Sequence, residues 1–182
     1  NRINTINKFF NSKTANNLKK FKNKTDLICA ANAICHIPDL KDLIKGIDSL
    51  LSRKGVFIFE EPYLGSMYKK ISYDQIYDEH IFMFSISSVK KVFDLFKFDL
   101  IDVKKQKTHG GSMRFYICKN SAKHKNTKTI KLIIKKEKKA NLHKFSTYLE
   151  FSKRVKKSKS NLIKIFKRLK NVFIIWHTFC SK

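Results

Sequence analysis

The chain has 182 residues, which is enough for one domain or for one domain with part of another. A hydrophobic content of 42% and an aromatic content of 13% exclude a wholly disordered chain. A formal net charge of +26 is typical of nucleic-acid or anionic-membrane binding. Here, however, the surplus is mostly Lys, spread over every segment, with Asn, Ile and Phe also abundant, as an AT-rich genome would supply. We therefore expect the charge to solvate the surface or attract a phosphorylated substrate, and nucleic-acid binding is the less favoured interpretation.

The four cysteines are Cys29, Cys35, Cys118 and Cys180, and no two of them form a C-x-x-C pair. We expect buried free thiols, with no metal site and no disulfide framework in this chain. The sequence shows no signal peptide and no apolar run long enough to span a bilayer, which favours a cytoplasmic protein. Because the chain begins at Asn1 rather than Met, we expect it to be a fragment or a processed product.

The first half of the chain predicts a strand, a helix and a second strand. A short helix over residues 15–21 precedes an apolar strand over residues 26–31. A clear amphipathic helix then runs from a capping Asp39 to Lys54, and Gly55 is expected at its left-handed C′ position. The strand over residues 56–59 follows at once. A connection of this length predicts two parallel strands.

Polar loops follow both of these strands, over residues 32–36 and 60–62, and a third loop over residues 73–80 is rich in ionisable groups. Ligands of open α/β sheets bind beyond the carboxyl ends of the strands, so we expect the three loops at one functional edge. Glu60 and Glu61 also fit a simpler interpretation, as surface residues that cap the end of the strand.

The second half predicts a helix from Ser85 or Ser87 and a strand over residues 100–103. A glycine-containing turn at residues 108–112 leads into a strand with alternating apolar residues at 113–118. Such a pair of strands is expected to be antiparallel and to close one edge of the sheet.

Beyond the sheet, residues 120–126 are polar and predict a linker, and residues 129–143 suggest a strand followed by a helix. A long basic helix is predicted over residues 145–170, with an apolar stripe that we expect to pack on a partner domain. Residues 172–176 suggest a further strand.

The loop over residues 73–80 holds two tyrosines, three carboxylates and a histidine. Composition alone favours a solvated acidic loop. A different chemistry also fits, because methylation of carbon requires a carbon nucleophile, which a base creates by removing a proton beside a ketone. A histidine suits that step since its pKa lies near working pH, and a tyrosine hydroxyl or a second histidine can stabilise the enolate oxygen.

The order of elements resembles the back half of a class I S-adenosylmethionine-dependent methyltransferase. Four blocks narrow this resemblance to the deoxysugar C-methyltransferase family, whose members methylate a ring carbon of nucleotide-linked keto sugars. The blocks are DLICAANAICHIPD at 26–39, GVFIFEEPY at 55–63, IYDEH at 76–80 and THGGSMR at 108–114.

The resemblance implies catalytic roles for His80 as general base, Glu79 as its orienting neighbour, and Tyr77 and His36 near the reacting sugar. It places Ala31 and Asn32 at the cofactor edge. It implies that one turn and the start of the next strand contact the sugar nucleotide, through His109, Gly110, Gly111, Ser112 and Arg114. Of these residues, Arg114 would contact a phosphate. Asp78 stands where the family often has a first histidine, which suggests a subfamily with another substrate.

Two parts of the family pattern are missing from these residues, namely the glycine-rich loop after the first strand and the N-terminal zinc-binding cysteine cluster. The resemblance therefore implies an incomplete site for S-adenosylmethionine and zinc only in a missing N-terminal region. We expect an α/β fold, with the back half of a Rossmann-like methyltransferase sheet over residues 1–119. Residues 120–182 would hold a linker and the truncated start of a second, largely helical α/β domain. An inactive methyltransferase-like remnant and a basic nucleic-acid-binding protein are the alternatives.

Overall fold

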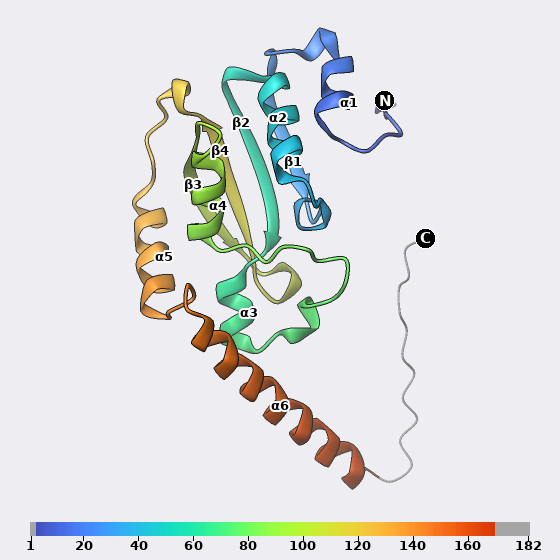
Figure 1. Ribbon diagram of the computed structural model, residues 1–182, viewed down its shortest axis with the longest axis vertical. Helices are drawn as coiled ribbons and strands as arrows, with labels where there is room; N and C mark the ends of the chain where they lie inside the picture. Colours follow the sequence, from blue (N-terminus) through green and yellow to red (C-terminus); the bar gives the residue numbers. More distant parts are fainter. Residues whose placement is uncertain (1–2, 170–182) are drawn as a thin grey trace.

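The computed structural model describes residues 3–169 as a mixed α/β fold built on one four-stranded sheet (Figure 1). The strands are β1 (Thr25–Ala31), β2 (Leu51–Pro62), β3 (Phe98–Gln106) and β4 (Ser112–Lys119). The α-helices are α1 (Ser12–Asn17), α2 (Leu40–Leu50), α3 (Leu64–Lys70), α4 (Ile86–Asp94), α5 (Lys128–Lys139) and α6 (Phe145–Arg168). The strand order is β1-β2-β4-β3. No helix in the described range is long and apolar enough to cross a membrane.

The unit β1-α2-β2 confirms the predicted parallel pair, with Leu27 opposite Val56 and Ala31 opposite Glu60. Helix α2 begins where the sequence indicated, because the side chain of Asp39 accepts a hydrogen bond from the backbone N–H of Asp42 at 2.9 Å. The apolar stripe of α2 is buried against the sheet.

The predicted end of α2 is wrong. The helix stops at Leu50, and β2 takes up the next twelve residues. Gly55 therefore lies inside β2, where a Cβ would come within 2.7 Å of the backbone oxygen of Thr25 on the neighbouring strand. The glycine permits the close approach of β1 and β2 and does not cap a helix.

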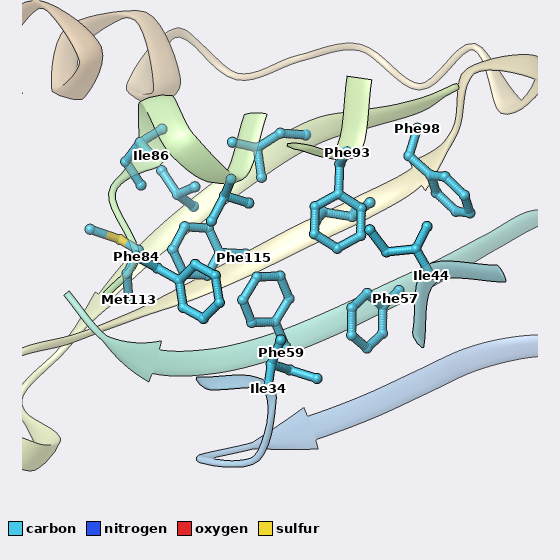
Figure 2. Packing of buried hydrophobic residues seen from close by; sticks show 14 of the residues in the cluster. Ile34, Ile44, Phe57, Phe59, Phe84, Ile86, Phe93, Phe98, Met113 and Phe115 are labelled. Atoms are coloured by element: carbon cyan, nitrogen blue, oxygen red, sulfur yellow. The ribbon is translucent and has the colours of Figure 1, made fainter. Parts of the chain in front are cut away.

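The core lies between the sheet and helices α2 and α4, and its centre is aromatic (Figure 2). Phe57 and Phe59 point to the same side of β2, as the two-residue period of a strand requires. The ring of Phe59 stacks on Phe115 of β4, with centroids 4.6 Å apart, and lies 6.0 Å from Phe93 of α4. Burial of each such ring stabilises the fold by roughly 2–3 kcal/mol.

The antiparallel pair confirms the predicted closing hairpin. Strand β4 lies between β2 and β3 and runs antiparallel to both, with Phe115 opposite Phe59 on one side and Val103 on the other. Met113, Phe115 and Ile117 are fully buried, as their alternation indicated. Helix α4 also begins as predicted, at Ser85, which forms a capping box with Ser88.

Two other predictions differ from the structure, and one helix was missed. The segment over residues 15–21 is not one helix, since α1 ends at Asn17 and a separate 3-10 turn, η1, follows at Lys19–Phe21. Helix α3 was not predicted. Residues 129–143 contain no strand: α5 is helical from Lys128, because Ile130 and Ile133 recur at helical spacing and bury against the core. The suggested strand over residues 172–176 lies outside the described residues.

Helix α6 confirms the long basic helix and leaves the sheet at an angle, past α3 (Figure 1). Its anchor is Phe151, whose ring lies 5.9 Å from that of Tyr68 on α3. The guanidinium of Arg154 stands 5.1 Å from the same tyrosine ring. Further along the predicted stripe, Leu162 and Phe166 are exposed.

Cys29 is exposed, so its predicted burial is wrong, whereas Cys35 and Cys118 are buried as predicted. The reason is the pleat of β1. Ile28 and Ala30 face the core, which leaves Leu27 and Cys29 on the opposite face of the sheet.

A candidate active site at the carboxyl edge of the sheet

The loop after β1 is held by a buried carboxylate. Glu61, near the end of β2, has no exposed surface. Its Oε1 accepts hydrogen bonds from three consecutive backbone N–H groups, those of Ala33, Ile34 and Cys35, at 2.9, 2.6 and 3.3 Å. These amides open the 3-10 turn η2 (Ile34–His36). Glu61 therefore fixes the turn that carries the predicted active-site histidine.

The tautomer of His80 follows from its surroundings. Its Nδ1 lies 2.8 Å from the carbonyl oxygen of Gln75, in the 3-10 turn η3 (Tyr73–Gln75). A carbonyl oxygen only accepts, so the ring carries its proton on Nδ1, and the neutral ring has a lone pair on Nε2. Nε2 is thus the ring atom that can accept a proton.

The hydroxyl of Tyr77 lies 2.7 Å from Nε2 of His80, and the two rings are 4.0 Å apart. Partial burial, followed by nearby negative groups, raises the pKa of the Tyr77 hydroxyl above its ordinary value. The phenol therefore stays protonated and donates to Nε2. This arrangement presents His80 as a hydrogen-bond acceptor, which is the form that a general base requires.

The loop after β1 and the base-bearing loop are joined directly. Nδ1 of His36 lies 2.7 Å from the carbonyl oxygen of Glu79, and the rings of His36 and His80 are 5.0 Å apart. The carbonyl oxygen of Cys35 accepts from the backbone N–H groups of Ile81 and Phe82, at 3.0 and 3.3 Å. The structure thus brings together the predicted pair His36 and His80 from segments more than forty residues apart.

Glu79 reaches this cluster through its backbone. Its side chain is exposed, and no hydrogen bond joins the Glu79 carboxylate to His80 in residues 3–169. The group that orients His80 is the Gln75 carbonyl. The role of the Glu79 carboxylate in tuning His80 stays a prediction.

The predicted substrate segment forms the tight turn η4 (Thr108–Gly110) ahead of β4, beside α3. The carbonyl oxygen of Gly110 accepts from Nζ of Lys70 at 2.6 Å. Gly111 has a φ of +127°, and a Cβ there would meet Ser66 at 2.7 Å, so only glycine fits. Ser112 is buried, and His109 is exposed with a φ of +47°.

Arg114 is already paired. Its Nη2 and Nε lie 2.9 and 3.1 Å from Oε2 of Glu60, whose Oε1 accepts from the Thr108 hydroxyl at 2.7 Å. About two-fifths of the Arg114 side chain remains exposed. A phosphate at this position would share the guanidinium with Glu60.

The two predicted cofactor residues lie at the carboxyl end of β1. Asn32 turns the chain with a φ of +50°, and its N–H donates to the carbonyl oxygen of Glu60 at 2.9 Å. Ala31 and Arg114 line one open hollow of about 440 Å³ on the sheet face that also carries Cys29. His36 and His80 do not line it, so the base and the hollow are separate parts of this edge.

Two residues of this cluster were missed by the sequence interpretation. The structure contradicts the assignment of Glu61 as a surface cap, because that residue has no exposed surface. The signal was the two-residue period of β2, which puts Glu61 on the same face as Phe57 and Phe59. Cys35 contacts the site through the same turn as His36, and burial, with the adjacent Glu61 carboxylate, raises the pKa of its thiol.

Comparison with known proteins adds an independent finding. The sequence profile of the family described as "Methyltransferase domain" matches residues 1–103, and that of "C-methyltransferase C-terminal domain" matches residues 107–172. C-methyltransferase NovU of Streptomyces niveus is 28% identical over 126 residues, which are 69% of this chain and 30% of that protein. The chain thus spans less than a third of the length of this curated relative.

Solved structures of methyltransferases also align. A possible histamine N-methyltransferase of Thermotoga maritima is 18% identical, with a TM-score of 0.41, over 56% of this chain and 60% of that chain. Magnesium protoporphyrin IX methyltransferase of Synechocystis is 15% identical, with a TM-score of 0.39, over 52% and 44%. The family profile over residues 1–103 covers more than half of the chain, and the predicted back half of the sheet is present: this chain belongs to the methyltransferase domain family.

Proposed function

We propose that the chain forms the base-bearing part of an S-adenosylmethionine-dependent C-methyltransferase, and that its substrate is a nucleotide-linked keto-deoxysugar. The observation that carries this proposal is the fixed tautomer of His80, whose Nε2 is presented as a proton acceptor beside a protonated Tyr77 and a second histidine, His36. Membership of the methyltransferase family and the likeness to a protein named as a C-methyltransferase support it.

In the proposed reaction, Nε2 of His80 removes the proton from the carbon beside the sugar ketone. The Tyr77 hydroxyl must leave Nε2 before this step, since the single lone pair of Nε2 cannot accept the phenol's hydrogen bond and the substrate's proton together. The Tyr77 side chain is 47% exposed, so it has room to turn toward the ketone oxygen and donate to the enolate that forms there. His36, five ångströms from His80 between ring centroids, is a second candidate donor in its imidazolium form, because the N–H of its neutral ring is held by the Glu79 carbonyl.

S-adenosylmethionine, when bound, supplies the electrophilic methyl group that the enolate carbon takes. Residues of this chain fit one wall of such a site, because the turn at Asn32 and the open hollow beside Ala31 leave space at the carboxyl end of β1. The five glycines, at 46, 55, 65, 110 and 111, form no G-x-G loop for the opposite wall. We predict weak binding by residues 1–182 alone; micromolar affinity in calorimetric titration would contradict this.

Arg114 lines the same hollow as Ala31, so a phosphorylated substrate would meet the cofactor there. The volume of the hollow, about 440 Å³, lies in the range of small-molecule sites. Arg114 offers a planar donor group, and the net charge of +26 favours approach of an anion. The deoxysugar itself rests on the resemblance of the four sequence blocks, and the division of the chain after residue 119 stays a prediction.

Isotope exchange tests the base without the cofactor. The chain is incubated with a nucleotide-linked keto sugar in D₂O, and deuterium at the carbon beside the ketone is measured by NMR. We expect His80→Gln to slow the exchange at least about 100-fold, the usual contribution of a general base. His124→Gln, an exposed histidine near Lys54, is the matched control. Exchange at the same rate in both variants would exclude His80 as the base.

A further inference from the structure

Three metal-ligating side chains meet at the candidate active site. One atom each from Cys35, His36 and His80 lies within 4.8 Å of the other two. Cys35 is buried, and both histidines are half-buried. A thiol with two imidazoles is a donor set that suits Zn²⁺, and three protein ligands leave the fourth tetrahedral position open. No metal-binding motif joins these residues in the sequence, because His80 lies on a different loop from Cys35 and His36.

The two histidine rings are oriented as metal ligands usually are. Nδ1 of His36 donates to the Glu79 carbonyl at 2.7 Å, and Nδ1 of His80 donates to the Gln75 carbonyl at 2.8 Å. Histidines that bind metals almost always donate their other ring N–H to a carbonyl or carboxylate. The rings therefore need no change of tautomer to bind a cation through Nε2.

The spacing is slightly wider than a zinc site requires. Three atoms at the 4.8 Å limit would surround a point about 2.8 Å from each of them. Bonds from zinc to nitrogen and sulfur are about 2.0–2.3 Å long, so each ligand atom must move inward by about 0.5–0.8 Å. Tyr77 must also release Nε2 of His80, and its half-exposed side chain allows this.

Charge at the site also favours a cation. The Cys35 thiol lies against the Glu61 carboxylate. Oε2 of Glu61 is buried and has no hydrogen-bond partner within residues 3–169. A cysteine thiolate and this carboxylate together carry two negative charges, which one divalent cation balances. The cation thus offsets the negative charge of the buried Glu61 carboxylate beside the Cys35 thiol.

We propose that Cys35, His36 and His80 form a zinc site. Binding converts the thiol of Cys35 into a zinc thiolate and releases its proton to solvent, with no change in oxidation state. Because Nε2 of His80 cannot hold a metal and accept a proton together, zinc is a reversible inhibitor of proton removal. The inhibition rests on the proposed function, whereas the metal site does not.

Cobalt(II) provides the direct test, since a cobalt–thiolate bond gives a charge-transfer absorption band. Metal-free chain carrying Cys180→Ser is titrated with CoCl₂, and we expect one equivalent to bind with that band. Cys35→Ser should abolish the band, and His80→Gln should weaken binding at least tenfold. Cys29→Ser and His143→Gln are the matched controls and should bind as the parent does. A band that survives Cys35→Ser, or that is lost in Cys29→Ser, overturns the proposal.

Two further measurements separate the site from folding and from the proposed reaction. Tyr77→Phe leaves Nε2 of His80 without its donor, so it should bind cobalt at least as tightly as the parent chain; weaker binding contradicts the geometry. Zinc should then stop the deuterium exchange of the parent chain at one equivalent. Normal cobalt binding with no exchange even in the absence of zinc would refute the proposed base and leave the metal site intact, whereas exchange that continues with zinc bound would refute the inhibition.

Discussion

Replacement of Glu137 tests how the C-terminal helices are attached to the sheet. Glu137 lies on α5 and is buried, although its neighbours in sequence are lysines. Its Oε1 accepts from the Tyr63 hydroxyl at 2.8 Å and from the backbone N–H of Ile86 at 2.7 Å. Its Oε2 accepts from the backbone N–H of Ser87 at 3.0 Å and from the Ser87 hydroxyl. The carboxylate thus caps the N-terminus of α4 from another helix.

Glu137→Ala leaves the Tyr63 hydroxyl and the Ile86 N–H buried without a partner, whereas the donors of the exposed Ser87 can turn to water. Each lost bond to a charged acceptor costs about 1.5–3 kcal/mol, and an unsatisfied buried donor costs about as much. Against this stands the desolvation of the carboxylate, several kcal/mol, which the variant no longer bears. We expect a net loss of about 3 kcal/mol in the free energy of unfolding, which corresponds to about 6–12 °C in Tm for a chain of this size.

Urea unfolding followed by circular dichroism measures this loss, and limited proteolysis between α5 and α6 reports whether the helices detach locally. Glu150→Gln is the matched control, since Glu150 lies on α6 with 58% of its side chain exposed and should change stability by under about 0.5 kcal/mol. A double-mutant cycle with Tyr63→Phe should show coupling of about 1 kcal/mol. A loss below about 1 kcal/mol for Glu137→Ala would refute the reasoning.

Three other outcomes are expected. Gly55→Ala should lower the free energy of unfolding in urea by about 1–3 kcal/mol, because its Cβ would press on Thr25 of the neighbouring strand. A decrease under about 0.5 kcal/mol would show that β1 and β2 can move apart at little cost. Cys29 should react first with a maleimide at neutral pH, and Cys118 far more slowly, since burial raises its pKa to about 11; mass spectrometry of the labelled peptides decides. Burial and Glu137 raise the pKa of Tyr63, so its stabilising contribution is complete below about pH 10 and is lost as pH rises above that value. The fall in unfolding free energy above pH 10 should therefore be smaller in Tyr63→Phe, and an equal fall would contradict it.

Sequence patterns correctly predicted the elements that depend only on residues close together in the chain. The apolar spacing of α2 and the cap at Asp39 are properties of a few neighbouring residues, and both appear as expected. The end of α2 was mistaken because Gly55 looked like a helix cap, whereas its real constraint is the oxygen of Thr25, thirty residues earlier. Helix α5 was partly mistaken for a strand because its apolar residues are few among many lysines.

The candidate site was predictable in its residue types and only partly in its contacts. His36 and His80 were identified by resemblance, and their proximity follows from strand order. The carbonyl of Gln75 as the orienting group of His80 has no sequence signal, because every residue carries a carbonyl. Likewise, Cys35 becomes part of the site only through the turn that Glu61 holds.

The position of β4 between β2 and β3 has a consequence for the order of folding. Strand β2 can pair with β1 early, but its other neighbour must come from far along the chain: Val56 pairs with Cys118, about sixty positions later. At a synthesis rate of about 5–20 residues per second, this edge of β2 stays unpaired for roughly 3–12 s until β4 has been made. The unpaired edge of β2 includes the apolar run from Val56 to Phe59, whose composition favours pairing with other chains. Aggregation during expression is thus expected to begin at this strand, and slower synthesis is expected to increase it.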